Sequence, residues 1–86
     1  MKARVINVEC RCGAVLFKYN KIGKGKLIKC YLPRILKDYV SLPKDVKIGM
    51  HILCLNCNNR IGTIYGIKGM RAIKLNQGQI KPFRLN

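Results

Sequence analysis

The sequence predicts a mainly β protein: a small antiparallel β-sheet domain stapled by one four-cysteine site. Three observations lead to this prediction. Short runs rich in β-branched residues recur along the chain, and four of the five cysteines form two close pairs. In addition, a chain of 86 residues has little room for a hydrophobic core that is stable without a staple. Because no repeat or linker divides the sequence, we expect residues 1–86 to form a single domain.

The expected strands lie on either side of the cysteine pairs. They cover residues 3–9, 14–19, 27–32, 46–53, 60–67, 70–75 and 79–84. The Lys68-Gly69 step predicts a tight hairpin turn, because glycine supplies a positive φ. The last three strands should therefore form an antiparallel meander. Residues 34–40 fit one helical turn and extended chain equally well.

The cysteine pairs have the spacing of metal-binding knuckles. Cys10 and Cys12 form a C-x-C-G pair, and Cys54 and Cys57 form a C-x-x-C pair. Zn²⁺ takes four thiolates at about 2.3 Å in a tetrahedron, and two short loops supply that set. Asn58 and Asn59, which follow the second pair, tolerate the left-handed turn that a knuckle requires. We therefore expect one structural zinc ion, because four sulfurs leave no open position for catalysis.

Two other residues could serve as metal ligands or reactive groups. Cys30 lies in an apolar run, where a single cysteine usually behaves as a small buried hydrophobic residue, with a substitute ligand or a reactive thiol as the alternatives. His51 precedes the second pair and is more readily explained without a metal role. A redox dithiol at Cys54 and Cys57 is a further alternative, but it leaves Cys10 and Cys12 unexplained.

The two knuckles also resemble a known family. Val8-Glu9-Cys10-Arg11-Cys12-Gly13 and the later Leu53-Cys54-Leu55-Asn56-Cys57 are similar to the zinc knuckles of the glutathione-dependent formaldehyde-activating enzymes and of the Rab-binding zinc chaperones. The resemblance implies a β-rich fold with the four cysteines as ligands of a structural zinc. A zinc ribbon resembles the pairs about as well. The enzymes also have a middle cysteine cluster for a catalytic zinc, where this chain has only Cys30.

The charge balance predicts a polyanionic partner. The chain has 18 Lys and Arg against 3 acidic residues, which gives a net charge of +15. Two basic groups with tyrosines among them have the composition of a surface that binds RNA or single-stranded DNA. The residues expected to contact nucleic acid are Lys18, Lys21, Lys24, Lys26, Lys29, Lys68, Arg71, Lys74, Lys81, Arg84, Tyr19 and Tyr31.

The alternative is a protein-interaction or chaperone-like zinc module whose basic face meets an acidic protein partner. An enzyme is not expected, because three scattered carboxylates and one histidine do not suggest a catalytic group. Apolar runs are too short for a membrane span, and the first residues lack a signal-peptide pattern. An odd number of cysteines argues against a closed disulfide framework. These features together favour a cytoplasmic protein without a membrane partner.

Overall fold

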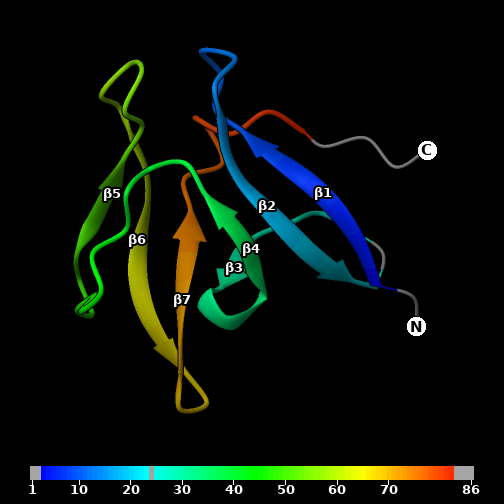
Figure 1. The fold of residues 1–86 in the computed structure, drawn as a ribbon, viewed down its shortest axis with the longest axis vertical. Helices are drawn as coiled ribbons and strands as arrows, with labels where there is room; N and C mark the ends of the chain where they lie inside the picture. The colour runs from blue at the N-terminus through cyan, green and yellow to red at the C-terminus, as the bar shows by residue number, and fades with distance from the viewer. Residues whose placement is uncertain (1–2, 24, 83–86) are drawn as a thin grey trace.

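The computed structural model describes residues 3–23 and 25–82, which form two antiparallel sheets (Figure 1). The strand order is β1-β2-β4 in the first sheet and β3-β7-β6-β5 in the second. The elements are β1 (Ala3–Glu9), β2 (Val15–Ile22), β3 (Lys29–Tyr31), the 3-10 turn η1 (Leu32–Arg34), β4 (Ile35–Asp38), β5 (His51–Leu53), β6 (Arg60–Ile67) and β7 (Met70–Leu75). The predicted mainly β fold class is therefore confirmed.

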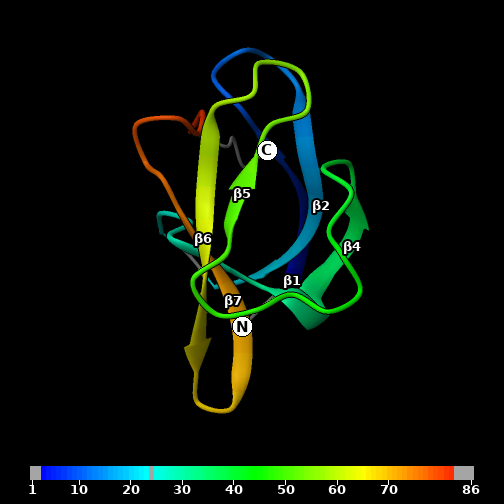
Figure 2. The same cartoon turned by 90° about the vertical axis from the view of Figure 1, so that its left-hand side faces the viewer.

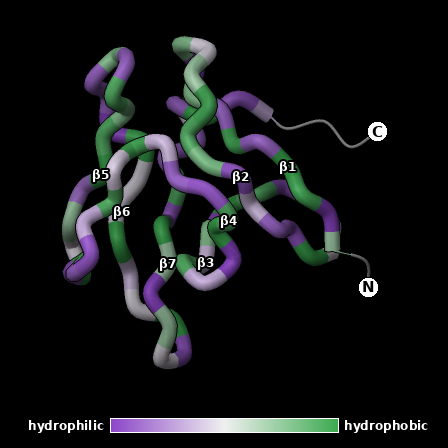
Figure 3. Tube along the Cα trace, viewed as in Figure 1, coloured by the Kyte–Doolittle hydropathy of each residue, from purple (hydrophilic) through white to green (hydrophobic). Residues whose placement is uncertain are grey.

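The two sheets form two layers with the core between them, as Figure 2 shows. Successive side chains of a strand point to opposite faces of the sheet, so every second residue points inward. In the last residues of β1, hydrophobic and hydrophilic positions alternate accordingly (Figure 3). One inward row crosses the second sheet, where Ile64 pairs with Ile73 and Ile73 pairs with Cys30. All three are fully buried. This row packs in one cluster with residues of the first sheet such as Phe17.

The Lys68-Gly69 turn and the extent of several strands match the sequence prediction. Lys68 has φ 49° and Gly69 has φ 78°, so both turn residues are left-handed, as a two-residue hairpin requires. The segment over 34–40 is extended from Ile35, after η1 has ended. Pro33 lies inside η1, where its fixed φ suits the first helical positions.

Two strand predictions were wrong. The expected strand over 46–53 is reduced to β5, because Gly49 at φ 92° and a turn from the Met50 amide to the Lys47 carbonyl interrupt extended chain. The expected strand over 79–84 contributes one bridge, between Cys10 and Ile80, within its described part. The meander is accordingly made by β5, β6 and β7.

Three segments meet at one end of the molecule, opposite the β6–β7 hairpin (Figure 1). They are the β1–β2 turn, the β5–β6 loop and the chain that follows β7. The Arg11 amide donates to the Gln79 carbonyl at 2.8 Å, and the Lys81 amide donates to the Glu9 carbonyl at 2.9 Å. These bonds fix the post-β7 chain against the β1–β2 turn. Within the described residues, no helix has the length and apolarity to cross a membrane.

Candidate metal centre

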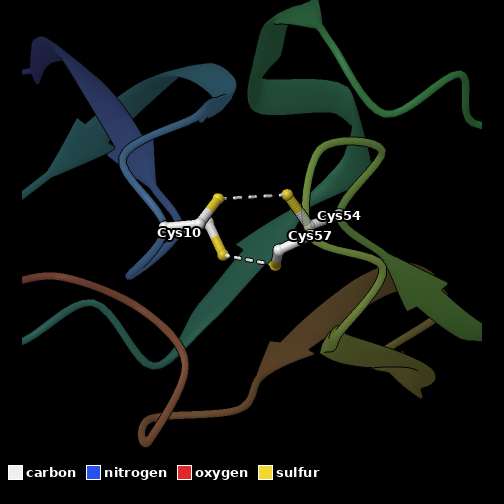
Figure 4. A group of neighbouring side chains, drawn as sticks. Cys10, Cys54 and Cys57 are labelled. Atoms are coloured by element: carbon white, nitrogen blue, oxygen red, sulfur yellow. Dashed lines mark hydrogen bonds between the residues drawn. The ribbon is translucent and has the colours of Figure 1, made fainter.

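The four predicted cysteines converge at this end of the fold. Their Sγ atoms all lie within 4.8 Å of one another. Cys10 Sγ is 3.6 Å from Cys57 Sγ, and Cys12 Sγ is 3.6 Å from Cys54 Sγ, so each contact joins one knuckle to the other (Figure 4). A tetrahedron with metal–sulfur bonds of about 2.3 Å has sulfur–sulfur edges of about 3.8 Å. The cluster therefore has the size and the donor set to hold one metal ion.

Backbone turns set the shape of both knuckles. In the first knuckle (residues 10–14), the Gly13 amide donates to the Cys10 carbonyl at 2.9 Å, and Gly13 has φ 99°. In the second knuckle (residues 54–59), the Asn58 amide donates to the Cys54 carbonyl at 2.8 Å, and Asn58 has φ 65°. In each case the residue after the second cysteine is left-handed. The left-handed turn predicted over Asn58 and Asn59 is made by Asn58, whereas Asn59 does not have a positive φ.

Side-chain amides point at the sulfurs. Asn56 Nδ2 donates to Cys12 Sγ at 3.4 Å, and Gln79 Nε2 donates to Cys10 Sγ at 3.3 Å, with a longer contact of 3.9 Å to Cys57 Sγ. Donors of this kind offset negative charge on thiolates and orient them towards a metal. Sequence reasoning missed Gln79, because 69 residues separate it from Cys10 and only the fold brings them together.

The sulfurs differ in acidity. The Asn56 side-chain amide and then the Ala14 backbone amide lower the pKa of Cys12 from 9.0 to about 6. The Asn59 amide lowers the pKa of Cys57, but desolvation and the other cysteine sulfurs outweigh that bond and raise it to about 11. A cation among the sulfurs would favour the thiolate form of all four, as metal ligation requires.

Neither Cys30 nor His51 belongs to the cluster. Cys30 is fully buried, and burial raises the pKa of its thiol from 9.0 to about 12, so it is protonated at neutral pH. His51 is exposed on β5, with its Nδ1 3.0 Å from Thr63 Oγ1. Cys30 is thus a small buried hydrophobic residue, as predicted, and His51 lies outside the cysteine cluster.

Part of the predicted nucleic-acid set lies on the outer face of the second sheet. Cross-strand pairing aligns Lys29 with Lys74, Lys74 with Thr63, and Thr63 with His51 in one row across all four strands. The neighbouring row on the same face joins Tyr31, Ala72 and Tyr65. We call these two rows the outer-face rows.

The remaining basic residues do not join them. Lys18 pairs with Lys37 on the other sheet. Lys68 and Arg71 are exposed at the β6–β7 hairpin, and Lys26 and Lys81 are exposed near the first knuckle. Lys24 and Arg84 lie outside the described residues.

Two predicted contact residues are instead buried. Tyr19 is 2% exposed, and its hydroxyl accepts a hydrogen bond from the Tyr31 amide at 2.9 Å. Lys21 is 5% exposed, with its Nζ donating to the Gly23 carbonyl at 3.1 Å. Both side chains alternate onto the inner side of β2, so neither presents a surface to a nucleic acid.

Comparison of the chain with protein-family models, with curated proteins and with solved structures finds no match. The likeness of the knuckles to the formaldehyde-activating family and the Rab-binding chaperones therefore stays a likeness of cysteine pattern. What the chain does has to be inferred from its own geometry.

Proposed function

We propose that this chain is a small zinc module that binds single-stranded nucleic acid, RNA or DNA, on the outer-face rows. Zinc is the metal that four thiolates in a tetrahedral arrangement favour. One ion would join two turns that are far apart in the sequence. Cys12 and Cys54 are 42 residues apart, and Cys10 and Cys57 are 47 residues apart. The role of the ion is structural, since a protein that ligates with four sulfurs leaves no position for substrate.

The observation that carries the nucleic-acid proposal is the combination of cations and tyrosines on one sheet face. Lys74 Nζ lies 5.4 Å from the centre of the Tyr65 ring, and Tyr65 is 46% exposed. Arg34 Cζ lies 5.5 Å from the centre of the half-buried Tyr31 ring. Ala72, between the two tyrosines, has no exposed surface. Bases stack on such rings while neighbouring cations neutralise phosphates.

The proposal includes no catalytic step. The cysteine outside the cluster is buried and protonated at neutral pH, so it is a poor nucleophile. The basic surface instead suits binding. With a net charge of +15, affinity for a polyanion should fall steeply as salt increases.

The test compares binding of oligo-RNA, single-stranded DNA and duplex DNA over a salt series. We expect both single strands to bind more tightly than the duplex, with about tenfold weaker binding for Tyr65→Leu, since one stacked base contributes about 1–3 kcal/mol. Lys74→Gln should reduce the salt slope by about one unit.

Lys18→Gln is the matched control, because it removes one charge from the other sheet. An equal effect of Lys18→Gln and Lys74→Gln would contradict the assigned face. Absence of nucleic-acid binding at low salt, together with salt-sensitive binding of an acidic peptide, would replace the proposal with the protein-partner alternative.

A further inference from the structure

A pocket of about 400 Å³ lies beside the first knuckle, and none of its lining residues belongs to the outer-face rows. Its apolar lining includes Val8, Leu27 and Ile80, and three cations also line it: Arg11, Lys26 and Lys81. No acidic residue is among the described residues that line it. The volume falls within the range of small-molecule sites, which combine an apolar body with a few placed polar groups.

Hydrogen bonds on two sides hold the pocket open. On one side, the Leu27 carbonyl accepts from Gln77 Nε2 at 3.2 Å, and the Ile28 carbonyl accepts from the Leu75 amide at 2.9 Å. On the other side, Arg11 Nε donates to the Gly78 carbonyl at 2.7 Å. That bond uses one of the five N–H groups of the Arg11 guanidinium and fixes its position at the pocket. The other N–H groups can donate to an anion.

The backbone that lines the pocket is open at Gly25. Gly25 has φ 103°, and an added Cβ there would meet nothing within 4 Å. Lys81 Nζ lies 4.0 Å from the position of a Cβ on Gly13. A ligand can therefore approach the main chain at Gly25, and the Lys81 ammonium group lies beside the first knuckle.

We propose that this pocket binds a nucleoside monophosphate, with the base against the aliphatic lining and the phosphate among the three cations. A phosphate monoester has a charge of about −1.5 to −2 at pH 7, which suits three cations better than a single carboxylate does. Inorganic phosphate would leave the apolar lining uncovered. The ligand is either a free mononucleotide or the phosphorylated end of a strand, because both present the same chemistry.

The experiment measures binding of AMP, adenosine and inorganic phosphate by calorimetry, and of 5′-phosphorylated and 5′-hydroxyl oligonucleotides by anisotropy. We expect AMP or the phosphorylated strand to bind more tightly than its phosphate-free counterpart. Lys26→Gln and Lys81→Gln should each weaken that binding about tenfold, as loss of a charge-assisted hydrogen bond does. Lys74→Gln is the matched control and should leave the preference for phosphate unchanged.

The outcomes separate the sources of the ligand. Binding of AMP without a preference between the two oligonucleotides assigns a free nucleotide, and a preference for the phosphorylated strand assigns a strand end. The proposal is overturned if AMP and adenosine bind equally and the two oligonucleotides also bind equally. It is also overturned if Lys26→Gln and Lys74→Gln reduce the preference for the phosphorylated ligand to the same extent. AMP binding does not require the outer-face rows. If the native protein does not bind 5′-hydroxyl strands, the proposed function fails, whatever the result for AMP. Metal content of each variant verifies that it is folded.

Discussion

The two knuckles each contribute two cysteine sulfurs to the cluster, but they differ in the hydrogen bonds that connect them to the rest of the protein. The first knuckle is braced by the chain after β7, which supplies the Cys10–Ile80 bridge, the bonds of Arg11 to Gln79 and Gly78, and an amide on Cys10 Sγ. The second knuckle has internal backbone bonds between Cys54 and residues 58 and 59. The residues between the cysteines are exposed in both knuckles, so the difference lies in the hydrogen bonds.

This difference indicates that the two knuckles are held in place in different ways. The first knuckle is positioned by hydrogen bonds that need no metal, so we expect it to be a preformed half-site. The second knuckle has fewer contacts with the rest of the chain, so we expect its position to depend more on a bound metal ion. Chain segments with few buried contacts open at the lowest free energy. Metal removal should therefore release the second knuckle before the first.

The largest effect should come from removing the metal. Structural zinc contributes about 10–16 kcal/mol of apparent binding free energy in small zinc peptides, which is comparable to the whole stability of a small domain. We expect Cys54→Ser to lose the metal and the cooperative thermal transition, as chelation should in the native chain. Metal analysis and circular dichroism measure both.

Partial chelation would test the comparison itself. Hydrogen exchange should show the Asn58 amide losing protection before the Arg11 amide. Simultaneous loss, with full recovery on adding zinc, would show that the first knuckle is not preformed. Cys30→Ala is the control, because it removes a thiol outside the cluster and should leave one metal ion bound.

The amides on the sulfurs should give the next largest effect. Gln79 Nε2 contacts one sulfur from each knuckle, whereas Asn56 Nδ2 contacts only Cys12. Loss of such partners usually weakens metal affinity about 10–100-fold. We expect Gln79→Met to weaken zinc affinity by about 100-fold and Asn56→Ala by about 10-fold. Competition with a zinc indicator measures both affinities. The reverse order would contradict the idea that the post-β7 chain stabilises the centre.

The sequence was sufficient to predict which four cysteines come together, because their pair spacing is local and typical of metal-binding knuckles. It also predicted the Lys68-Gly69 turn and the bounds of β1, β6 and β7, where pattern and turn residues agree. It did not predict Gln79 as a sulfur partner or the place of residues 79–82. Those depend on a return of the chain to the first knuckle, which no local pattern encodes.

The basic surface was harder to predict for a related reason. Charge along the sequence does not say which sheet a lysine occupies. Lys29 and Lys74 become neighbours only through the pairing of β3 with β7, and Lys18 lies on the other sheet. Tyr19 and Lys21 share the inward phase of β2, which an unclear alternation over residues 14–22 did not reveal.

A smaller effect is expected from the left-handed residue of the first knuckle. Gly13→Ala should destabilise the zinc-bound protein by about 1–2 kcal/mol, because φ 99° is unfavourable for an L residue. The cost is torsional, since a Cβ there would meet only Lys81 Nζ, at 4.0 Å. Urea unfolding in excess zinc measures it. A loss below about 0.5 kcal/mol would mean that this knuckle adjusts more easily than its bracing suggests.

The smallest effect should be at the matching position of the second knuckle. Asn58 at φ 65° occupies a region that asparagine tolerates and glycine enters freely. Asn58→Gly should change the unfolding free energy by no more than about 0.5 kcal/mol, and Asn58→Ala should cost about 1 kcal/mol. The same urea titration measures both variants. If glycine costs as much as alanine, the Asn58 side chain contributes more than its backbone conformation. The second knuckle would then have support of its own, and the contrast between the knuckles would be smaller than the hydrogen bonds indicate.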